Sequence, residues 1–411
     1  MKKENTMAEN ALPTGWRTTT LGEVVELVSE KISCNNVDIK KYISTENMLP
    51  YKGGVKLAAT IPSNGNCSSF EIGDVLFSNI RTYFQKVWLA SFKGGSSNDV
   101  IIFRPKIKDE LNKDYLYYMI CNDRFIDYTV LTAKGTKMPR GDKDAIKQYS
   151  LFLPSLNEQK AIAKVLSSFD DKIELLQEQN KTLEETAQTI FKEWFGKYQV
   201  GDKLPEGWIV YALDDIIKIV NGYSYKGKEL KEDSENALVT LKNFDRTGGF
   251  QSRGFKPFEG VPKTSQEVKI GDLVIAHTDL TQDAEVLGNP AFIFDNSGFK
   301  KMYITMDLVK VDIKIKEFTN AFMYYLMKTK RFKAHCKGYS NGTTVLHLAK
   351  NAVPEYKIVL TKDLDLIIKF SELADNSTNK IAYNISQIQS LKKIRDELLP
   401  KLMKGSIRVQ N

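Results

Sequence analysis

The sequence predicts an α+β protein with two similar mixed α/β domains, separated by two long helices that form an antiparallel coiled-coil spacer. Three observations support this prediction. Motifs in the first half of the chain return in the same order in the second half. Each half ends in a long stretch whose apolar residues recur at helical spacing. The two stretches occupy matching places, so each helix offers the other an apolar surface to cover.

The internal repeat begins with the motif LPxGW, at residues 12–16 and again at residues 204–208. A Gly-Asp turn then leads into a short apolar strand, within residues 70–81 and again within residues 268–280. Matching turns before matching strands indicate that the two halves share a framework, because turn residues and apolar runs together define local structure.

The second part of each repeat contains an aspartate triplet, an aromatic helix and a Gly-Thr loop. The triplets are residues 98–100 and 306–308, the helices residues 114–125 and 321–332, and the loops residues 134–142 and 340–348. Extra residues of the second copy fall between these elements, and loops that vary on a shared scaffold often carry recognition. The predicted segments are a disordered N-terminus (1–11), a first domain (12–155), a long helix (156–199), a second domain (200–362) and a second long helix (363–408).

The first long helix contains no proline after Pro154 and no glycine before Gly196. At a rise of about 1.5 Å per residue, the stretch 158–198 spans roughly 60 Å. Its apolar residues alternate steps of three and four, as in a heptad seam, and Asn180 interrupts them with the kind of polar side chain that fixes register. The seam residues are Ile173, Leu176, Asn180, Leu183, Ala187, Ile190 and Trp194.

The second long helix carries a matching stripe within residues 364–407. An ordinary core helix would explain either stripe by itself. Two long stripes at matching places in the two halves instead predict that the helices pair with each other. The seam residues of the second helix are Ile381, Asn384, Ile388, Leu391, Arg395, Leu398 and Leu402.

Composition indicates a cytoplasmic protein. The chain of 411 residues is long enough for two or three domains, and its net charge of +8 is compatible with a polyanionic partner. Its four cysteines form no CxxC pair, its first residues contain no apolar signal segment, and no apolar run approaches the roughly 18 residues of a membrane span. We therefore expect reduced cysteines and no membrane association.

Enzyme signatures are absent from the sequence. It contains no GxxxxGK[ST] phosphate loop, and no GxGxxG follows a strand. The three histidines, His277, His335 and His347, lack metal-ligand spacing, so no metal site and no catalytic residue is predicted. Residues 355–357 match half of a nuclease ExK motif, but such triplets are frequent by chance. A binding protein is the interpretation that remains.

Nucleic acid is the ligand that the paired loops fit best. Lys and Arg neutralise phosphates, and Arg and Asn can bond bidentately to guanine and adenine. Any one of these loops could be a solvated turn, so the prediction rests on their paired arrangement. The candidates in the first half are Thr45, Asn47, Asn79, Arg81, Tyr83, Lys134, Thr136, Lys137 and Arg140. Those in the second half are Lys242, Asn243, Thr278, Asn341, Thr343, Thr344 and His347.

The length of the seam predicts a bipartite target. From Ile173 to Trp194 the seam covers about 33 Å at the helical rise per residue. Two sites on one face of B-DNA lie about 34 Å apart for each helical turn. Two recognition domains at the ends of such a rod would bind two half-sites with an unread gap between them.

Several of these motifs together resemble the specificity subunits of type I restriction-modification systems. The matching motifs are LPxGW in both halves, IGDVLFS at residues 72–78, LPSLNEQKAIAKVLSSFDDKIELLQ from Leu153 onward, and LLPKLMKGSIRV at residues 398–409. The entry into the first helix, Leu-Pro followed by Glu-Gln-x-x-Ile-Ala, is fairly specific to this family, whereas LPxGW alone is weak. The resemblance runs from about Leu12 to Val409.

The resemblance implies a non-catalytic subunit with two target recognition domains, each recognising one half of a split sequence in double-stranded DNA. It implies that two methyltransferase (modification) subunits dock on the helical regions and that motor-nuclease (restriction) subunits join them. Adenine N6 would be modified, and S-adenosylmethionine would bind to the methyltransferase partner, so we expect no cofactor on this chain. The alternatives are a stand-alone bipartite DNA-binding regulator and an enzyme with an unrecognised site.

The chain departs from the family pattern in two places. Glu158 and Gln159 have no counterpart in the second helix, where the matching positions hold Leu366 and Ile367. The loop at residues 340–348 also fits the family's loop pattern better than the loop at residues 134–142 does. The second departure affects the loop at residues 134–142, which contains predicted DNA contacts.

Overall fold

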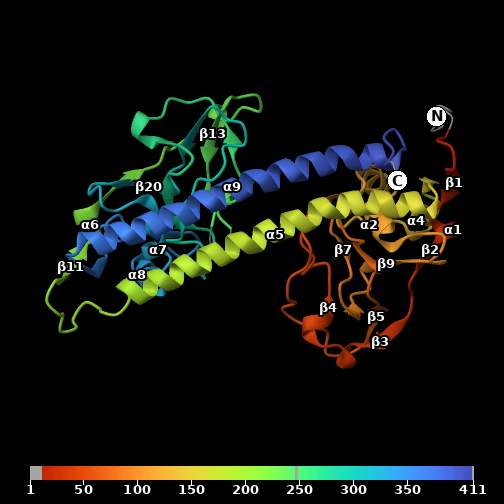
Figure 1. The fold of residues 1–411 in the computed structure, drawn as a ribbon, viewed down its shortest axis with the longest axis horizontal. Coiled ribbons are helices and arrows are strands. Elements are labelled where there is room, and N and C mark those ends of the chain that lie inside the picture. Colours follow the sequence, from red (N-terminus) through yellow and green to blue (C-terminus); the bar gives the residue numbers. More distant parts are fainter. Residues whose placement is uncertain (1–11, 246–248, 282, 410–411) are drawn as a thin grey trace. The chain divides into compact units, whose positions relative to one another are not determined.

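The structure, a computed structural model, describes residues 12–245, 249–281 and 283–409, and the chain divides into two compact units (Figure 1). Unit 1 comprises Met1–Ile173 and Ser390–Asn411, and unit 2 comprises Glu174–Gln389. Each unit combines small sheets with short helices, and both long helices contribute to both units. This architecture confirms the predicted fold class. The predicted disordered N-terminus, residues 1–11, lies outside the described residues.

Unit 1 contains a two-stranded sheet and two four-stranded sheets. Strands β1 and β10 pair antiparallel, β2-β9-β6-β7 form an antiparallel sheet, and β3-β5-β8-β4 form a sheet in which only β4 and β8 run parallel. The strands are β1 (Arg17–Thr20), β2 (Val25–Leu27), β3 (Lys31–Ser33), β4 (Tyr42–Ile43), β5 (Asn66–Phe70), β6 (Val75–Ser78), β7 (Val87–Leu89), β8 (Gly94–Ser96), β9 (Val100–Pro105) and β10 (Ser150–Leu153). The short helices are α1 (Leu21–Val24), α2 (Lys113–Cys121), α3 (Asp123–Leu131) and α4 (Lys143–Lys147).

Unit 2 repeats this plan and adds a three-stranded sheet, β17-β22-β21. Its strands are β11 (Trp208–Ala212), β12 (Ile217–Asn221), β13 (Asn236–Val239), β14 (Lys256–Pro257), β15 (Glu267–Val268), β16 (Leu273–Ala276), β17 (Thr278–Asp279), β18 (Pro290–Phe292), β19 (Lys301–Ile304), β20 (Leu308–Ile313), β21 (Ser340–Asn341), β22 (Leu346–Leu348) and β23 (Lys357–Thr361). Its short helices are α6 (Leu213–Ile216), α7 (Asn320–Met327) and α8 (Lys330–Gly338).

The sheet topology confirms the internal repeat. In unit 2, β11 pairs antiparallel with β23, and β12-β20-β16-β18 matches β2-β9-β6-β7. The parallel pair β13–β19, with β15 antiparallel to β19, matches β4, β8 and β5. The fourth strand differs, since β3 pairs with β5 in unit 1 whereas β14 pairs with β13 in unit 2. The copies therefore share a framework and vary at one sheet edge.

Each predicted aromatic helix is two helices, which corrects the expectation of single helices at residues 114–125 and 321–332. Asn122 has extended backbone angles, and its side chain accepts a hydrogen bond from the backbone N–H of Arg124, so α2 ends and α3 begins there. Thr329 caps α8 in the same way by accepting from the N–H of Phe332. Side-chain capping breaks the chain into two helices even though the apolar periodicity continues.

The long helices α5 (Leu156–Phe195) and α9 (Leu364–Met403) run alongside each other in opposite directions (Figure 1). In unit 1 Arg395 of α9 pairs with Asp170 of α5, and in unit 2 Asn384 donates hydrogen bonds to Asn180 (2.8 Å) and Gln179 (2.9 Å). None of the helices in the described part of the chain combines the length and apolar character that crossing a bilayer requires.

The predicted seam residues lie on the covered sides of α5 and α9. The buried ones are Ile173, Leu176, Ala187, Ile381, Ile388 and Leu402. The half-buried ones are Asn180, Leu183, Ile190, Trp194, Leu391, Arg395 and Leu398. Asn384, which follows Ile381 in the seam of α9, is fully buried at 0% exposure, and its Oδ1 has no hydrogen-bond partner within the described residues. The polar pair Asn180–Asn384 therefore interrupts the apolar seam in unit 2, as the ion pair Arg395–Asp170 does in unit 1.

Both long helices complete the core of each unit. In unit 2 Phe191 and Phe195 of α5 contact Phe370 of α9 at ring-centroid distances of 5.3 and 5.6 Å, and Phe322 of α7 joins the same cluster. In unit 1 Ile162 and Leu166 of α5 and Leu399 and Leu402 of α9 are buried in one cluster with α2. Fully burying each such side chain contributes on the order of 1.5–3 kcal/mol, so neither core closes without both helices.

The start of α5 is fastened by a buried polar pair. Glu158 accepts hydrogen bonds from the indole N–H of Trp16 (3.0 Å) and from the guanidinium of Arg408 (2.9 and 2.8 Å). Gln159 accepts from the backbone N–H of Asn112 and donates to the carbonyl of Glu110 (both 2.9 Å). The family-like Glu-Gln pair thus ties both ends of the described chain to α5 within unit 1.

Cys34 and Cys67 form a disulfide in the structure, which corrects the expectation that all cysteines are reduced. Their Cα atoms lie 5.4 Å apart, a separation that permits a bridge. Cys34 follows β3 and Cys67 lies on β5, and these strands pair, so folding brings together two residues that are far apart in sequence. Cys121 and Cys336 are buried free thiols whose pKa burial raises to about 12.

The loop after β17 is held by one buried carboxylate. Asp279, only 1% exposed, accepts hydrogen bonds from the backbone N–H groups of Thr281 (2.8 Å), Val286 (2.7 Å) and Leu287 (3.1 Å). Burial by itself would raise the pKa of Asp279, but these hydrogen bonds outweigh it and lower the pKa below its ordinary value. Asp279 therefore holds the backbone of Thr281, Val286 and Leu287 against the end of β17.

Replacing both Asn180 and Asn384 by leucine should raise the unfolding temperature of unit 2. The change removes a buried polar pair with an unsatisfied oxygen, whose burial costs about 1–3 kcal/mol. Calorimetric unfolding of the double variant should be compared with a control that carries Gln177→Leu and Asn379→Leu, two exposed positions on the same helices. If the seam variant unfolds at or below the temperature of the control, the asparagines stabilise the pairing and do not weaken it.

The Asp279→Asn variant should lose stability at neutral pH by about 1–3 kcal/mol, because ionised acceptors form the stronger hydrogen bonds. The folded pKa of Asp279 is lowered. Its contribution is therefore present above the unfolded aspartate pKa of about 3.9 and disappears as the pH falls through the folded value. The difference in unfolding temperature between the parent and Asp279→Asn should thus shrink from pH 7 to pH 3. Asp283→Asn, at an exposed position of the same loop, is the control. A difference independent of pH would contradict this assignment.

Candidate nucleic-acid interface

The Gly-Thr loop of unit 1 is a tight hairpin. Lys134 and Arg140 exchange backbone hydrogen bonds, with N–H to O distances of 2.8 and 2.9 Å. Gly135 turns the chain at φ +92°, in the left-handed region where a side chain is disfavoured. The tip exposes Thr136 and Lys137. The hairpin therefore presents its side chains on a short, rigid turn.

This hairpin is hydrogen-bonded to the segment that follows β6. The N–H of Arg81 donates to the carbonyl of Pro139 (2.9 Å), and that of Gly141 donates to Asn79 (3.1 Å). The N–H of Asn79 in turn donates to the carbonyl of Asp99 (2.8 Å). Three segments far apart in sequence thus meet at one edge, where Arg81 and Arg140 are both exposed.

Unit 2 repeats the arrangement in its strand pairings. His347 lies opposite Asn341 on one side and Thr278 on the other, as Arg140 lies opposite Lys134 and Ile80 in unit 1. Gly342 turns this hairpin at φ +118°. The N–H of His277 donates to the carbonyl of Asp307 (2.8 Å), which matches the bond from Asn79 to Asp99. The backbone geometry is shared, although the side chains differ.

The two repeated aspartates support this edge through their side chains as well. In unit 1 the carboxylate of Asp99 lies 3.1 Å from the guanidinium of Arg140. In unit 2 the carboxylate of Asp307 accepts a hydrogen bond from the hydroxyl of Thr278 (2.9 Å). Asp99 and Asp307 occupy the same place in the two sequence repeats, and this recurrence was the sequence signal that they help to hold the edge.

Positive charge gathers on the edge of unit 1. A hydrogen bond with Asp142 raises the pKa of Lys134 and lowers that of Asp142. Arg81 and Lys137 form no salt bridge with any of the described residues. Two cations are therefore unneutralised beside two that are paired, which is the charge distribution expected where a polyanion binds.

Strained backbone marks a neighbouring loop of unit 1 that the sequence analysis missed. Tyr51, Lys52, Arg81 and Gln85 all have positive φ, between 50° and 61°. The N–H groups of Tyr51 and Lys52 donate to the carbonyls of Phe84 and Gln85 (both 2.8 Å), so the four residues adjoin one another. Such strain clusters at functional sites. Non-glycine residues in this conformation leave no sequence signal, because their strain depends on contacts elsewhere.

The edge of unit 2 is less charged. Burial lowers the pKa of the half-buried His277, which favours its neutral form. His347, Asn341 and Thr344 are exposed on the hairpin. Neutral imidazole, amide and hydroxyl groups both donate and accept hydrogen bonds, so this edge suits polar contacts more than neutralisation of charge.

Asn47 and Asn243, two of the predicted contact residues, form hydrogen bonds within their own loops. Asn47 donates from Nδ2 to the carbonyls of Tyr42 and Lys56 (both 2.9 Å). Asn243 accepts from the N–H of Thr240 (2.9 Å) and donates to the carbonyl of Gln251 (3.1 Å). Both side chains are buried, and each follows the matching strand, β4 or β13.

The predicted contact residues of each half of the chain lie in one unit, but they differ in their exposure to solvent. In unit 1 the loop at residues 44–55 is bonded to the segment that follows β6, because Lys86 donates to the carbonyl of Thr45 and the N–H of Tyr51 donates to the carbonyl of Phe84. The exposed ones are Arg81, Tyr83, Lys134, Thr136, Lys137, Arg140, Lys242, Asn341, Thr343, Thr344 and His347. Thr45 is half-buried, and the buried ones are Asn47, Asn79, Asn243 and Thr278.

These edges offer hydrogen-bond donors and cations and no obvious metal site. Within the described residues no group of three or more His, Cys, Asp and Glu side chains is placed to hold a metal ion. What the two edges can do is hold a ligand that presents both negative charge and polar base edges.

Comparisons with known proteins agree with this arrangement. Residues 13–185 match the family model of the type I restriction modification DNA specificity domain. The MjaIX specificity subunit of a type I restriction enzyme from Methanocaldococcus jannaschii is 28% identical over 74% of this chain and 71% of its own length. The MjaVIII specificity subunit from the same organism is 24% identical over 100% of this chain and 97% of its own.

The fold is shared with a solved protein. The crystal structure of the S subunit of a type I restriction-modification system from M. genitalium superposes with a TM-score of 0.57 at 19% identity, over 98% of both chains. The relatives extend over both units, whereas the family model covers unit 1 up to the middle of α5. On these matches, residues 13–185 correspond to a type I restriction modification DNA specificity domain, and the chain as a whole is similar to the specificity subunits of type I restriction enzymes.

Proposed function

We propose that this chain recognises a bipartite DNA sequence, with one half-site bound at each hairpin edge and an unread gap between them. The observation that carries the proposal is the repeated edge, in which equivalent backbone bonds hold Arg140 in unit 1 and His347 in unit 2. A shared backbone with exchanged side chains is what two recognition sites for different sequences require, because base identity is read by side-chain donors and acceptors.

The two edges would contact DNA differently. In unit 1 Arg81 and Arg140 can bond bidentately to guanine, and Lys137 can neutralise a phosphate. In unit 2 Asn341 can pair with adenine, while Thr344 and His347 can bond to either base edge. We assign the buried Asn47, Asn79, Asn243 and Thr278 to positioning the recognition loops, since burial keeps their side chains from a base.

The long helices are proposed as the spacer and the assembly surface. A helix of 40 residues such as α5 or α9 is about 60 Å long, which exceeds one turn of B-DNA. In the proposal, methyltransferase and restriction subunits dock on this helical region, the methyltransferase supplies S-adenosylmethionine, and this chain does no chemistry itself. The support is the similarity to type I specificity subunits, the length of the helices and the hydrogen-bonding character of both edges.

The decisive experiment is co-expression of the chain with the methyltransferase subunit encoded beside it, followed by mapping of N6-methyladenine in the host DNA. We expect one split motif with a fixed gap, which disappears when this chain is omitted. A contiguous motif would contradict recognition by two edges. Binding of duplex DNA without new methylation would favour the stand-alone regulator instead.

Reciprocal substitutions should separate the two half-sites. Arg81→Ala should relax the motif on one side of the gap, and His347→Ala should relax it on the other, each by about 5–150-fold in preference, the equivalent of about 1–3 kcal/mol for a base contact. Arg17→Ala, which removes an arginine from β1 that pairs with Glu110, is the control. If Arg81→Ala weakens every sequence equally, Arg81 contacts phosphate; if both variants relax the same side, the assignment of one half-site to each unit is wrong.

A further inference from the structure

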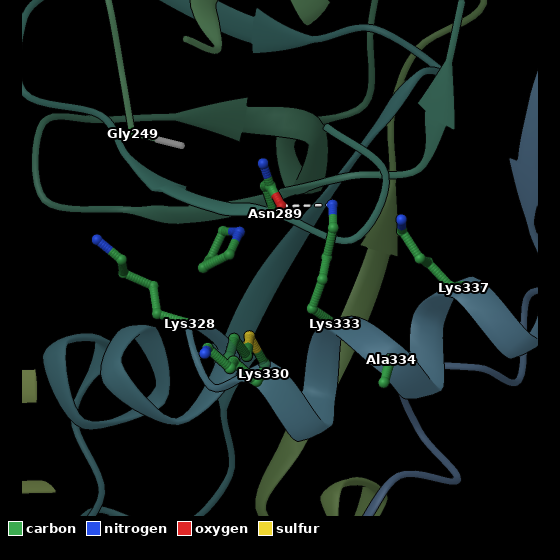
Figure 2. A pocket seen from close by; sticks show the side chains of 9 residues that line it. Gly249, Asn289, Lys328, Lys330, Lys333, Ala334 and Lys337 are labelled. Carbon is green, nitrogen blue, oxygen red and sulfur yellow. Dashed lines mark hydrogen bonds between the residues drawn. The ribbon is translucent and has the colours of Figure 1, made fainter. Parts of the chain in front are cut away.

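A cavity of about 360 Å³ in unit 2 is lined by an unusual concentration of lysine (Figure 2). Lys328 borders it from the end of α7, Lys330, Lys333 and Lys337 border it along α8, and Asn289 faces them from the loop that precedes β18. None of the described residues that line it is Asp or Glu. Like charges at one cavity repel each other. An anion bound there would reduce the repulsion among these lysines.

Two of these lysines are engaged and two are available. Lys333 reaches across the cavity to Asn289 Oδ1 (2.6 Å) and also donates to the carbonyls of Leu287 (2.7 Å) and Glu285 (3.0 Å), as Figure 2 shows for Asn289. Lys328 pairs with Glu184 at 2.6 Å. Lys330 and Lys337 are exposed and form no salt bridge within the described chain. Lys333 therefore fixes the wall, while Lys330 and Lys337 can bind a ligand.

Lys333 is a partly buried ammonium group with no carboxylate among the acceptors of its hydrogen bonds. Burial lowers the pKa of Lys333 to about 8. Its three ammonium hydrogens have three acceptors, so the group is bonded but not neutralised. A nearby anion would stabilise the charged form and raise this pKa.

Comparison with unit 1 shows that the fold does not require lysine at these positions. The equivalent helices α3 and α8 share an Arg-Phe pair, in which Phe125 and Phe332 are both fully buried. Counting from that pair, the positions of Lys330, Lys333 and Lys337 are occupied in α3 by Asp123, Ile126 and Val130. Unit 1 builds the same helix without these lysines, so in unit 2 they serve a purpose other than helix formation.

The cavity adjoins the recognition edge of unit 2. Its Asn289 wall belongs to the loop that starts at β17, which pairs with β22 of the hairpin. The other wall, α8, ends at Gly338 and leads directly into β21 of the same hairpin. Gly288 lies so close to Cys336 of α8 that an added Cβ would sit 2.6 Å from its Cβ, which fixes the two walls against each other. A ligand at the hairpin would therefore lie next to the end of α8 that carries Lys337.

We propose that this lysine cavity binds a phosphate group, and that the phosphate belongs to the backbone of the DNA held at the second hairpin. The inference rests on the proposed function and adds an asymmetry to it. Lys330 and Lys337 anchor the DNA without regard to sequence beside the polar edge of unit 2, and α3 of unit 1 has no equivalent pair. Unit 1 instead carries its cations, Arg81 and Lys137, on the recognition edge itself.

The test is the salt dependence of DNA binding by the complex of this chain with its methyltransferase subunit. Lys330→Ala with Lys337→Ala should weaken binding by the same factor on the cognate sequence and on DNA with a scrambled second half-site. The slope of log K against log salt should fall in magnitude by about 2, one for each phosphate that the variant no longer neutralises. The methylated motif should not change.

The matched control is Lys218→Ala with Lys316→Ala. These lysines are also exposed in unit 2, but they lie near the end of β20, whereas the hairpin adjoins its beginning. If the slope of log K against log salt for the Lys330→Ala, Lys337→Ala variant equals that of this control, the assignment of a phosphate site is wrong. Relaxation of one half of the motif would also overturn it, because the lysines would then contact bases.

Free phosphate is distinguished by a separate measurement on the same proteins. If inorganic phosphate or triphosphate raises the unfolding temperature of the parent and not of the Lys330→Ala, Lys337→Ala variant, while their DNA salt slopes agree, the cavity serves a small phosphate compound and the assignment to DNA is wrong. Failure of the proposed function itself would look different, since the parent complex would then methylate no split motif.

Discussion

Closure of each hydrophobic core by both long helices is the constraint on which the rest of the structure depends. Phe195 of α5 and Phe370 of α9 meet in the core of unit 2, and Leu166 of α5 and Leu402 of α9 share the core of unit 1. Each helix has residues in both units and carries apolar side chains that it cannot bury alone. The helices are therefore structural parts of both units, and the core of each unit fixes one part of each helix.

The same position at the start of each long helix is stabilised by different chemistry. Glu158 and Gln159 of α5 use hydrogen bonds, including the bond to the indole of Trp16. The matching α9 positions hold Leu366 and Ile367, and Ile367 is fully buried in the core of unit 2. The repeat thus keeps the place where the helix begins, while the polar connection is confined to the unit in which Arg408 near the end of the described chain returns to α5.

Recognition and support are separated on each hairpin edge. Backbone hydrogen bonds place Arg140 and His347 at equivalent positions. Asp99 pairs with Arg140, and Asp307 accepts a hydrogen bond from Thr278, the residue opposite His347. Since the backbone supplies the geometry, the exposed side chains can change without loss of the fold. In the proposed function this separation allows two half-sites of different sequence, and the lysines of α8 add attraction for the DNA backbone without adding sequence preference.

The sequence by itself determined the repeat, the two long helices, the fold class and the resemblance to type I specificity subunits, because turn residues and apolar periodicity are local signals that can be read in each half of the chain. Only the tertiary structure decided which polar side chains face solvent. Asn47 and Asn243 are buried fasteners, and Asn122 divides a helix whose apolar pattern continues. The lysine cavity also depends on α8 meeting the loop that contains Asn289. The role of a polar group is set by its hydrogen-bond partners, and those partners come from segments that only folding brings together.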